Sequence, residues 1–298
     1  MVGIRGGLLP RSSDAPGPTL SLWLVSLFLS RKLVAMIAAV LTSAVAVARD
    51  QPPIPSMYSD ASSIMEAITR EQPRSAVNLS VTGISVPHHL LAADLIARGF
   101  WAASTGKYDR IVLLSPDHFN RSRLPLATTR RNFRTVFGLL ENDLAATDPL
   151  LEAGDLFEDS DLFEAEHGIS ALLPFVKHFF PSAKIVPIAI SSRSTRADWD
   201  RAVTVLEKMI GPRVLVVQST DYSHYRPLSV AVQRDQETLN IIAANDADAV
   251  ERLIQVSHMD SKAAQYLQTR LQSGALRSHG VVVANRNSEA YGTSGLST

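Results

Sequence analysis

Histidines in this chain often stand beside a carboxylate or a second histidine, in stretches far apart along the sequence. Neutral imidazole is the commonest nitrogen ligand of zinc, iron, copper and nickel. A mononuclear site needs about three protein ligands and an open position, and two histidines with one carboxylate suit non-haem iron. These residue types therefore indicate a metal site or acid–base chemistry. The four stretches are Pro87-His88-His89, Asp117-His118, Glu166-His167 and Asp221-Tyr222-Ser223-His224.

Each stretch also has an ordinary structural interpretation. Glu166 could lie at a helix start, where the helix dipole favours a negative charge. Asp221 and His224 could form an Asx-turn with a surface histidine, and Asp117 could occupy a turn. His89 is expected to point away from His88, because adjacent side chains diverge. The remaining histidines are expected to have packing or surface roles: His178, His258 and His279.

The elements around these stretches explain how they could meet. Apolar runs predict buried strands at 78–86, 110–115, 183–191, 213–219 and 279–285, and helical spacing predicts helices between them. This alternation is typical of a mostly parallel or mixed sheet covered on both faces. Ligands in such folds bind outside the carboxyl ends of the strands. Three of the histidine stretches directly follow predicted strands, so we expect them to share one edge of the sheet.

Composition excludes several other classes of site. The 298 residues carry a formal net charge of zero, so a nucleic-acid partner held by phosphate contacts is not expected. The chain has no cysteine, so a metal must be held by histidine, carboxylate, backbone or water. Nucleotide-binding glycine motifs, a nucleophile elbow and H-E-x-x-H are all absent from the sequence.

The first fifty residues differ from the rest. Arg31-Lys32 precedes the apolar block 33–48, which predicts a signal peptide or membrane anchor over 1–48. The domain is then expected to be exported or membrane-anchored, and the membrane contact to involve only this segment. A mis-assigned start codon is the alternative, and it would leave the protein cytoplasmic. Residues 49–77 are expected to be a Pro-rich linker and a short helix, and 78–298 the α/β domain.

The histidine stretches, with their neighbours, resemble the Memo-like family, also called AmmeMemoRadiSam system protein B. The resemblance runs from about residue 80 to about residue 290. Its motifs are "VPHHLLAADLIARGF", "IVLLSPDHF", "EAEHGIS" with "LPF", "STDYSHY" and "NRNSEAYG". It implies a three-layer α/β/α fold related to the LigB-type class III extradiol dioxygenases, and an iron or copper site.

By motif, the resemblance makes His88 and His118 metal-binding histidines, with Asp221 and His224 in the same pocket. Some members supply a cysteine as third ligand from a later helix. This chain offers His258, Asp260 or Ser261 in that region. We expect His88, His118 and Asp260 to bind a single divalent transition metal, with iron or copper favoured and zinc as the alternative.

The leading functional hypothesis is a metal-dependent oxidoreductase acting on an unidentified small molecule. His224 and Asp221 would then carry the acid–base chemistry, with Glu166 and His167 in support. A non-catalytic metal- or partner-binding module and a metal-dependent hydrolase are the alternatives.

Overall fold

A six-stranded mixed sheet forms the centre of the computed structural model, which describes residues 51–75 and 80–293. The strand order is β1-β8-β2-β7-β3-β6, and neighbouring strands are parallel except for the antiparallel pair β3 and β7. A separate hairpin joins β4 (Phe133–Thr135) to β5 (Gly138–Leu140). The sheet strands are β1 (Gly83–Val86), β2 (Arg110–Pro116), β3 (Leu126–Thr128), β6 (Phe157–Asp159), β7 (Lys184–Ile190) and β8 (Val214–Ser219).

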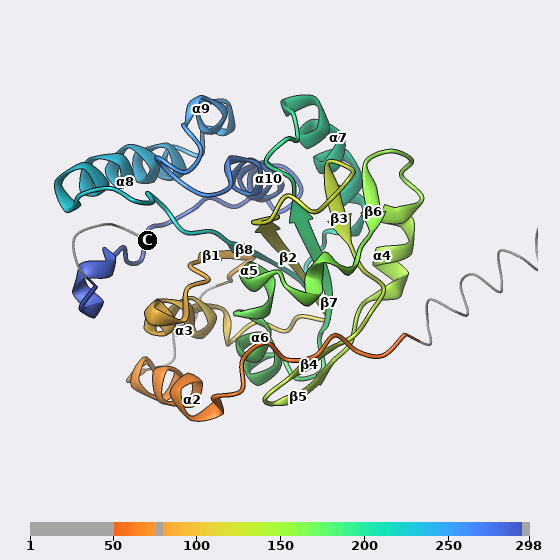
Figure 1. The fold of residues 1–298 in the computed structure, drawn as a ribbon, viewed down its shortest axis with the longest axis horizontal. Coiled ribbons are helices and arrows are strands. Elements are labelled where there is room, and N and C mark those ends of the chain that lie inside the picture. The colour runs from red at the N-terminus through yellow and green to blue at the C-terminus, as the bar shows by residue number, and fades with distance from the viewer. Residues whose placement is uncertain (1–50, 76–79, 294–298) are drawn as a thin grey trace, which may run out of the picture. The chain divides into compact units, whose positions relative to one another are not determined.

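Helices cover both faces of this sheet, because alternate side chains of each strand point to opposite sides. On β2, Ile111 and Leu113 belong to one buried cluster, whereas Val112 and Leu114 belong to the other. Figure 1 shows the two helical layers on either side of the sheet. The layer at Ile111 contains α2 (Ala61–Arg70), α3 (Ala93–Ala103), α5 (His167–Ser170) and α6 (Leu173–Phe179).

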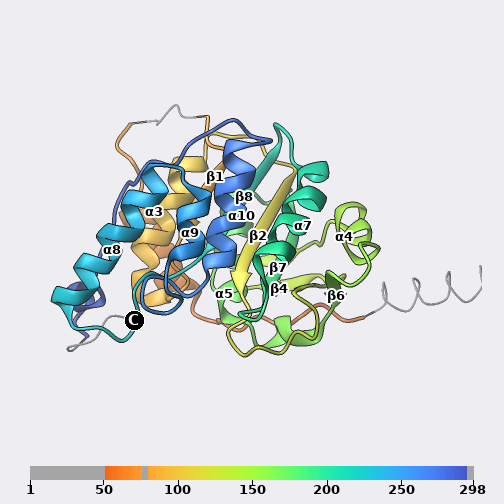
Figure 2. The same cartoon turned by 90° about the horizontal axis from the view of Figure 1, so that it is seen from above.

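The second layer packs on Val112 and Leu114. Figure 2 shows α10 of this layer along β8 and β2, beside α7. Outside it lies α8 (Leu228–Ala243), which contacts α9. The three-layer α/β fold that we expected is therefore confirmed. The second layer contains α4 (Leu144–Leu151), α7 (Arg196–Leu206), α9 (Ala247–Arg252) and α10 (Lys262–Ser273).

The N-terminal part of the chain carries two predictions, a signal peptide or membrane anchor over 1–48 and a linker with a short helix over 49–77. The segment 1–48 lies outside the described residues. No helix within residues 51–75 and 80–293 is long and apolar enough to cross a membrane. The stretch expected as linker and short helix contains α2, and its Ile54 is buried and bridges Phe133 of the hairpin.

The strand expected over 279–285 is not formed, and this prediction was wrong for the structure described. These residues have irregular backbone and pair with no strand of the described sheet. Three consecutive valines gave the sequence a strand-like pattern, but pattern alone does not supply a partner edge.

Candidate metal centre

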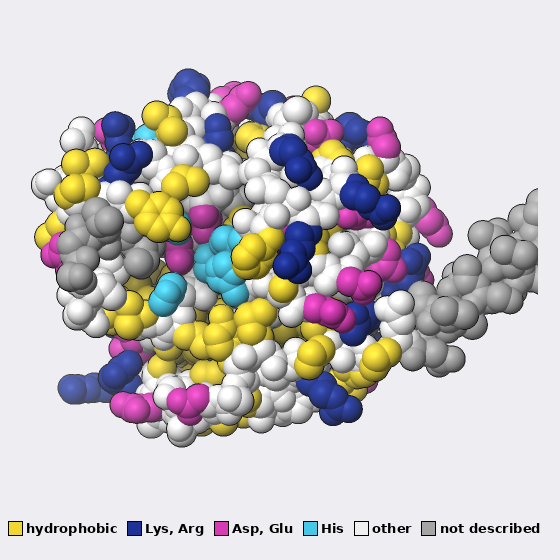
Figure 3. Space-filling model, in the orientation of Figure 1, with side chains coloured by type: hydrophobic (Ala, Val, Ile, Leu, Met, Phe, Trp, Pro, Cys, Tyr) yellow, Lys and Arg dark blue, Asp and Glu magenta, His cyan; other side chains and the backbone are white. Residues whose placement is uncertain are grey.

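Three histidines from separate segments meet at the carboxyl ends of the strands. His88 follows β1, His118 follows β2, and His167 begins α5. One nitrogen from each ring lies within 4.8 Å of the others, a geometry that could hold a metal ion. His88 is buried and the other two are half-buried. Figure 3 shows a group of histidine side chains at the middle of this face, beside acidic side chains.

Sheet order explains the meeting. β8 lies between β1 and β2 and runs parallel to both, so all three strands end at the same edge. Ser219 at the end of β8, and Asp221 just after it, reach His88 from more than a hundred residues away in sequence. The loops after the three strands thus converge, as open α/β sheets generally arrange their ligand sites.

Hydrogen bonding to Ser219 fixes the orientation and the tautomer of the His88 ring. Its Nδ1 lies 3.1 Å from the hydroxyl of Ser219, which donates its own proton to the carbonyl of Gly168. Ser219 therefore accepts from His88 Nδ1–H, and Nε2 keeps its lone pair toward the cluster. Burial, opposed by the charge of Asp260, lowers the pKa of His88 to about 3. The ring is neutral, as a metal ligand must be.

Glu166 fixes the second imidazole. Its buried carboxylate accepts from the backbone N–H of His118 at 2.9 Å, from His118 Nδ1 at 2.6 Å and from the N–H of Gly168 at 2.8 Å. Nε2 of His118 is consequently left facing the cluster. Burial by itself lowers the pKa of His118, but the carboxylates of Asp260 and Glu166 outweigh it and raise the pKa to about 9.

Asp260 supplies a carboxylate beside both rings. Its Oδ2 lies 3.3 Å from His88 Nε2 and 3.7 Å from His118 Nε2. Donors about 2.1 Å from a tetrahedral ion stand about 3.4 Å apart, so these separations fit a shared metal. Its Oδ1 is buried and has no hydrogen-bond partner within the described residues. A buried carboxylate oxygen without a partner is costly, and a cation would satisfy it.

Asp221 supports the same corner. Its Oδ1 accepts from the backbone N–H of His88 at 3.1 Å, and its own N–H donates to Asp260 at 3.1 Å. Its Oδ2 lies 3.6 Å from His88 Nε2. Burial raises the pKa of Asp221, although the nearby His224 opposes this. Asp221 therefore hydrogen-bonds to both His88, which follows β1, and Asp260, which precedes α10.

Six of the seven residues expected in the site lie in this cluster. His167, to which we assigned a supporting role, lies among the possible donors: its ring centroid is 3.9 Å from that of His118. His224 lies outside the three-histidine group, and its Nδ1 donates to the carbonyl of Tyr222. The six are His88, His118, Glu166, His167, Asp221 and Asp260.

Sequence reasoning missed Ser219 and Tyr58, and two further histidines that it considered, His89 and His258, make other contacts. Ser219, which orients His88, carries no motif that would reveal this contact. Tyr58 is half-buried, and burial followed by the charge of Glu166 raises its pKa. His89 turns to cap the short helix at Leu90–Ala92, and His258 pairs with Glu237.

Comparison with known proteins gives a consistent result. The family model described as "Memo-like protein" matches residues 55–270. A "MEMO1 family protein" of Caldivirga maquilingensis is 27% identical over 191 residues, 59% of this chain and 66% of the relative. One from Saccharolobus solfataricus is 30% identical over 171 residues, covering 54% and 60%. One from Pyrobaculum arsenaticum is 29% identical, covering 48% and 52%. The chain spans less than two thirds of these relatives' lengths.

Proposed function

Because the chain belongs to the Memo-like protein family, we propose that its histidine cluster binds one divalent transition metal and that this centre is the functional site. The observation that carries the proposal is the convergence of His88, His118 and His167 with Asp260 at one strand edge. Ser219 and Glu166 each bind the Nδ1 side of a histidine, which supports the idea that the two Nε2 atoms are kept for a ligand.

His88, His118 and Asp260 are the ligands in this proposal, and His167 completes the shell or binds beside it. The donors are imidazole and carboxylate with no thiolate, since the chain has no cysteine. Such a set suits ferrous iron, and copper or zinc less specifically. We therefore favour iron.

The reaction class that we propose is oxidation of a small molecule, by analogy with the LigB-type dioxygenases. A bound metal would supply a position at which oxygen or substrate is polarised. The side chains of His118 and His167 are 18% and 35% exposed, so a small molecule has access from this side. His224 would move the proton: its Nδ1–H is engaged by Tyr222, which leaves Nε2 as the base.

Metal content of the purified full chain tests the site. We expect about one equivalent of metal per chain after loading with Fe(II) or Zn(II), and a loss of at least tenfold in affinity in the His88→Ala/His118→Ala variant. His178→Ala is the matched control, because His178 on α6 lies outside the three-histidine group and its ring packs against the rings of Phe137 and Phe179. Equal metal in the double variant and the control would refute the proposal.

The missing thiolate also favours a second candidate, a metal-binding module without catalysis. Oxygen consumption with catechols and hydrolysis of ester and phosphate substrates separate the two. Both would be measured on the metal-loaded chain beside His224→Ala. Turnover that His224→Ala abolishes supports the enzyme. An occupied site that stays inactive toward all of them favours the binding module.

A further inference from the structure

One edge of the central sheet is open. β1 is the outermost strand of the described sheet, and β8 is its neighbour. The carbonyls of Thr82 and Val86 accept from Val216 and Thr220 on the β8 side. Peptide groups along a parallel strand point alternately to its two sides, so those of Gly83 and Ser85 face away from β8. An open edge of this kind is a template for another strand.

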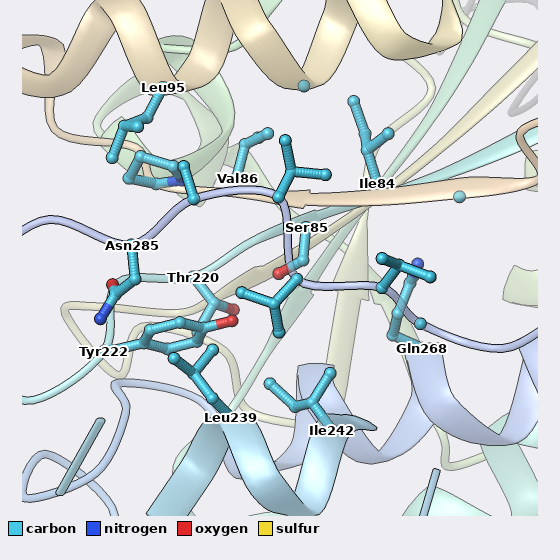
Figure 4. Close-up of a pocket in the computed structure, with 18 of the residues that line it drawn as sticks. Ile84, Ser85, Val86, Leu95, Thr220, Tyr222, Leu239, Ile242, Gln268 and Asn285 are labelled. Atoms are coloured by element: carbon cyan, nitrogen blue, oxygen red, sulfur yellow. The ribbon is translucent and has the colours of Figure 1, made fainter. Parts of the chain in front are cut away.

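The segment between Ser278 and Arg286 runs along this edge, and a side-chain contact holds each of its ends. Near the start of β1, the hydroxyl of Ser278 lies 2.8 Å from that of Thr82. Beyond the end of β1, Arg286 pairs with Asp94 at the start of α3. Figure 4 shows the chain that leads to Asn285 crossing beside Ser85, between α3 on one side and α8 and α10 on the other. The segment therefore runs in the same direction as β1.

Between these ties the segment forms no ladder with a strand of the described sheet, although its sequence is that of a strand. Val281, Val282 and Val283 are 74%, 42% and 69% exposed, an unusual fate for three consecutive β-branched residues. A cavity of about 630 Å³ is lined by both the segment and β1, together with α3, α8 and α10. Apolar side chains and an open strand edge thus face a gap that neither fills.

We propose that residues 279–285, the strap, close onto β1 as a seventh, parallel strand, and that the arrangement described here is the open form. The pairing of Ser278 with Thr82 sets the register, with Val281 opposite Ser85 and Val282 opposite Val86. Closure satisfies the peptide groups of Gly83 and Ser85 and buries valine surface in the gap. The same cavity is lined by Pro87 and Asp221, so the strap opens and closes a space that reaches the back of the histidine cluster.

Engineered disulfides test the register, because the natural chain contains no cysteine. Paired residues of adjacent strands lie close enough to bridge, whereas residues two positions out of register do not. We expect the full chain with Ser85→Cys/Val281→Cys to form its disulfide at least tenfold faster than the matched control Ser85→Cys/Val283→Cys. Equal rates in the two variants, or free thiols in the first, would overturn the proposal.

Hydrogen exchange of the unmodified chain gives an independent readout. A strap that closes protects the amide of Val282, because in the proposed register this N–H faces β1 and donates to the carbonyl of Ser85. The amides of Val281 and Val283 face away from β1 and serve as internal controls. We expect the Val282 amide to exchange at least about tenfold slower than in unstructured chain. Exchange of the Val282 amide at the unstructured rate would overturn the proposal, whatever the folding of the cysteine variants.

Discussion

At the scale of single residues, Glu166 determines what His118 can do. One buried carboxylate accepts three N–H groups, two of them from His118. The imidazole is thereby held with Nε2 toward Asp260. A histidine whose second nitrogen is bound in this way is a better and better-oriented metal ligand.

Replacing Glu166 with Gln should weaken metal binding without removing any ligand. The amide keeps the size of the side chain, but its NH₂ group cannot accept from His118. We expect affinity for Zn(II) to fall by about 10- to 100-fold, measured by competition with a chromogenic chelator. Glu164→Gln is the control, because Glu164 pairs with Arg131 instead. A Glu166→Gln protein that binds metal as tightly as this control contradicts the role.

Sequence predicted the positions of these residues better than their contacts. The placement of His88, His118 and Asp221 directly after strands indicated one shared edge, because parallel strands end together. The partnership of His88 with Ser219 spans 131 residues and depends on a side-chain rotamer, so no periodicity encodes it. His167 does not directly follow a strand, and we expected it only to support the site. In the structure its ring nitrogen lies close enough to those of His88 and His118 to bind the same metal ion.

At the scale of elements, local signals account for most helix boundaries. Asp60 caps α2 by accepting from the backbone N–H groups of Ser62 and Ser63, as a capping aspartate should. Hydrogen bonds from the hydroxyls of Ser62 and Ser63 lower the pKa of Asp60 to about 2. Whether residues 279–285 form a strand depends on pairing with β1, nearly two hundred residues away, and a local apolar pattern does not encode that pairing.

The cap makes the stability of α2 depend on pH. Because the folded pKa of Asp60 is below its ordinary value of 3.8, its contribution is present above about pH 4 and is lost as pH falls toward 2. The urea midpoint of Asp60→Asn should therefore lie below that of the parent chain at pH 7, and this gap should narrow between pH 4 and pH 2. Glu66→Gln, an exposed change on α2, should show no such narrowing. A difference in urea midpoint that does not change with pH would show that the ionised form of Asp60 does not stabilise α2.

At the scale of the whole molecule, two separate apolar clusters pack on the two faces of the sheet that carries the site. Phe100 of α3 is fully buried in one of them, with its ring centroid 5.8 Å from those of Phe175 and Phe179. The continuous apolar run of β2 predicted a strand covered on both faces, and its side chains enter both clusters. The order of the strands could not be anticipated, because it depends on contacts between distant segments.

Phe100→Ala should destabilise the molecule while leaving the metal site chemically intact. We expect the free energy of unfolding to fall by about 3–5 kcal/mol, from lost burial and the cavity left behind, measured by urea unfolding. Val232→Ala on α8, where the side chain is 57% exposed, should change it by less than about 0.5 kcal/mol. Metal stoichiometry of folded Phe100→Ala should equal that of the parent chain. A change below 1 kcal/mol would show that α3 is not part of the core.

The donor set at the strand edge has a consequence for how the protein tolerates oxidants. Asp260 stands in the region where some members of the family carry a cysteine, and the chain contains no thiol anywhere. Peroxide, disulfide exchange and alkylating agents act on thiolates through a ladder of sulfur oxidation states that imidazole and carboxylate do not possess. We therefore expect metal occupancy of the proposed site to respond to pH and to the free metal concentration, and not to the thiol redox potential of its surroundings.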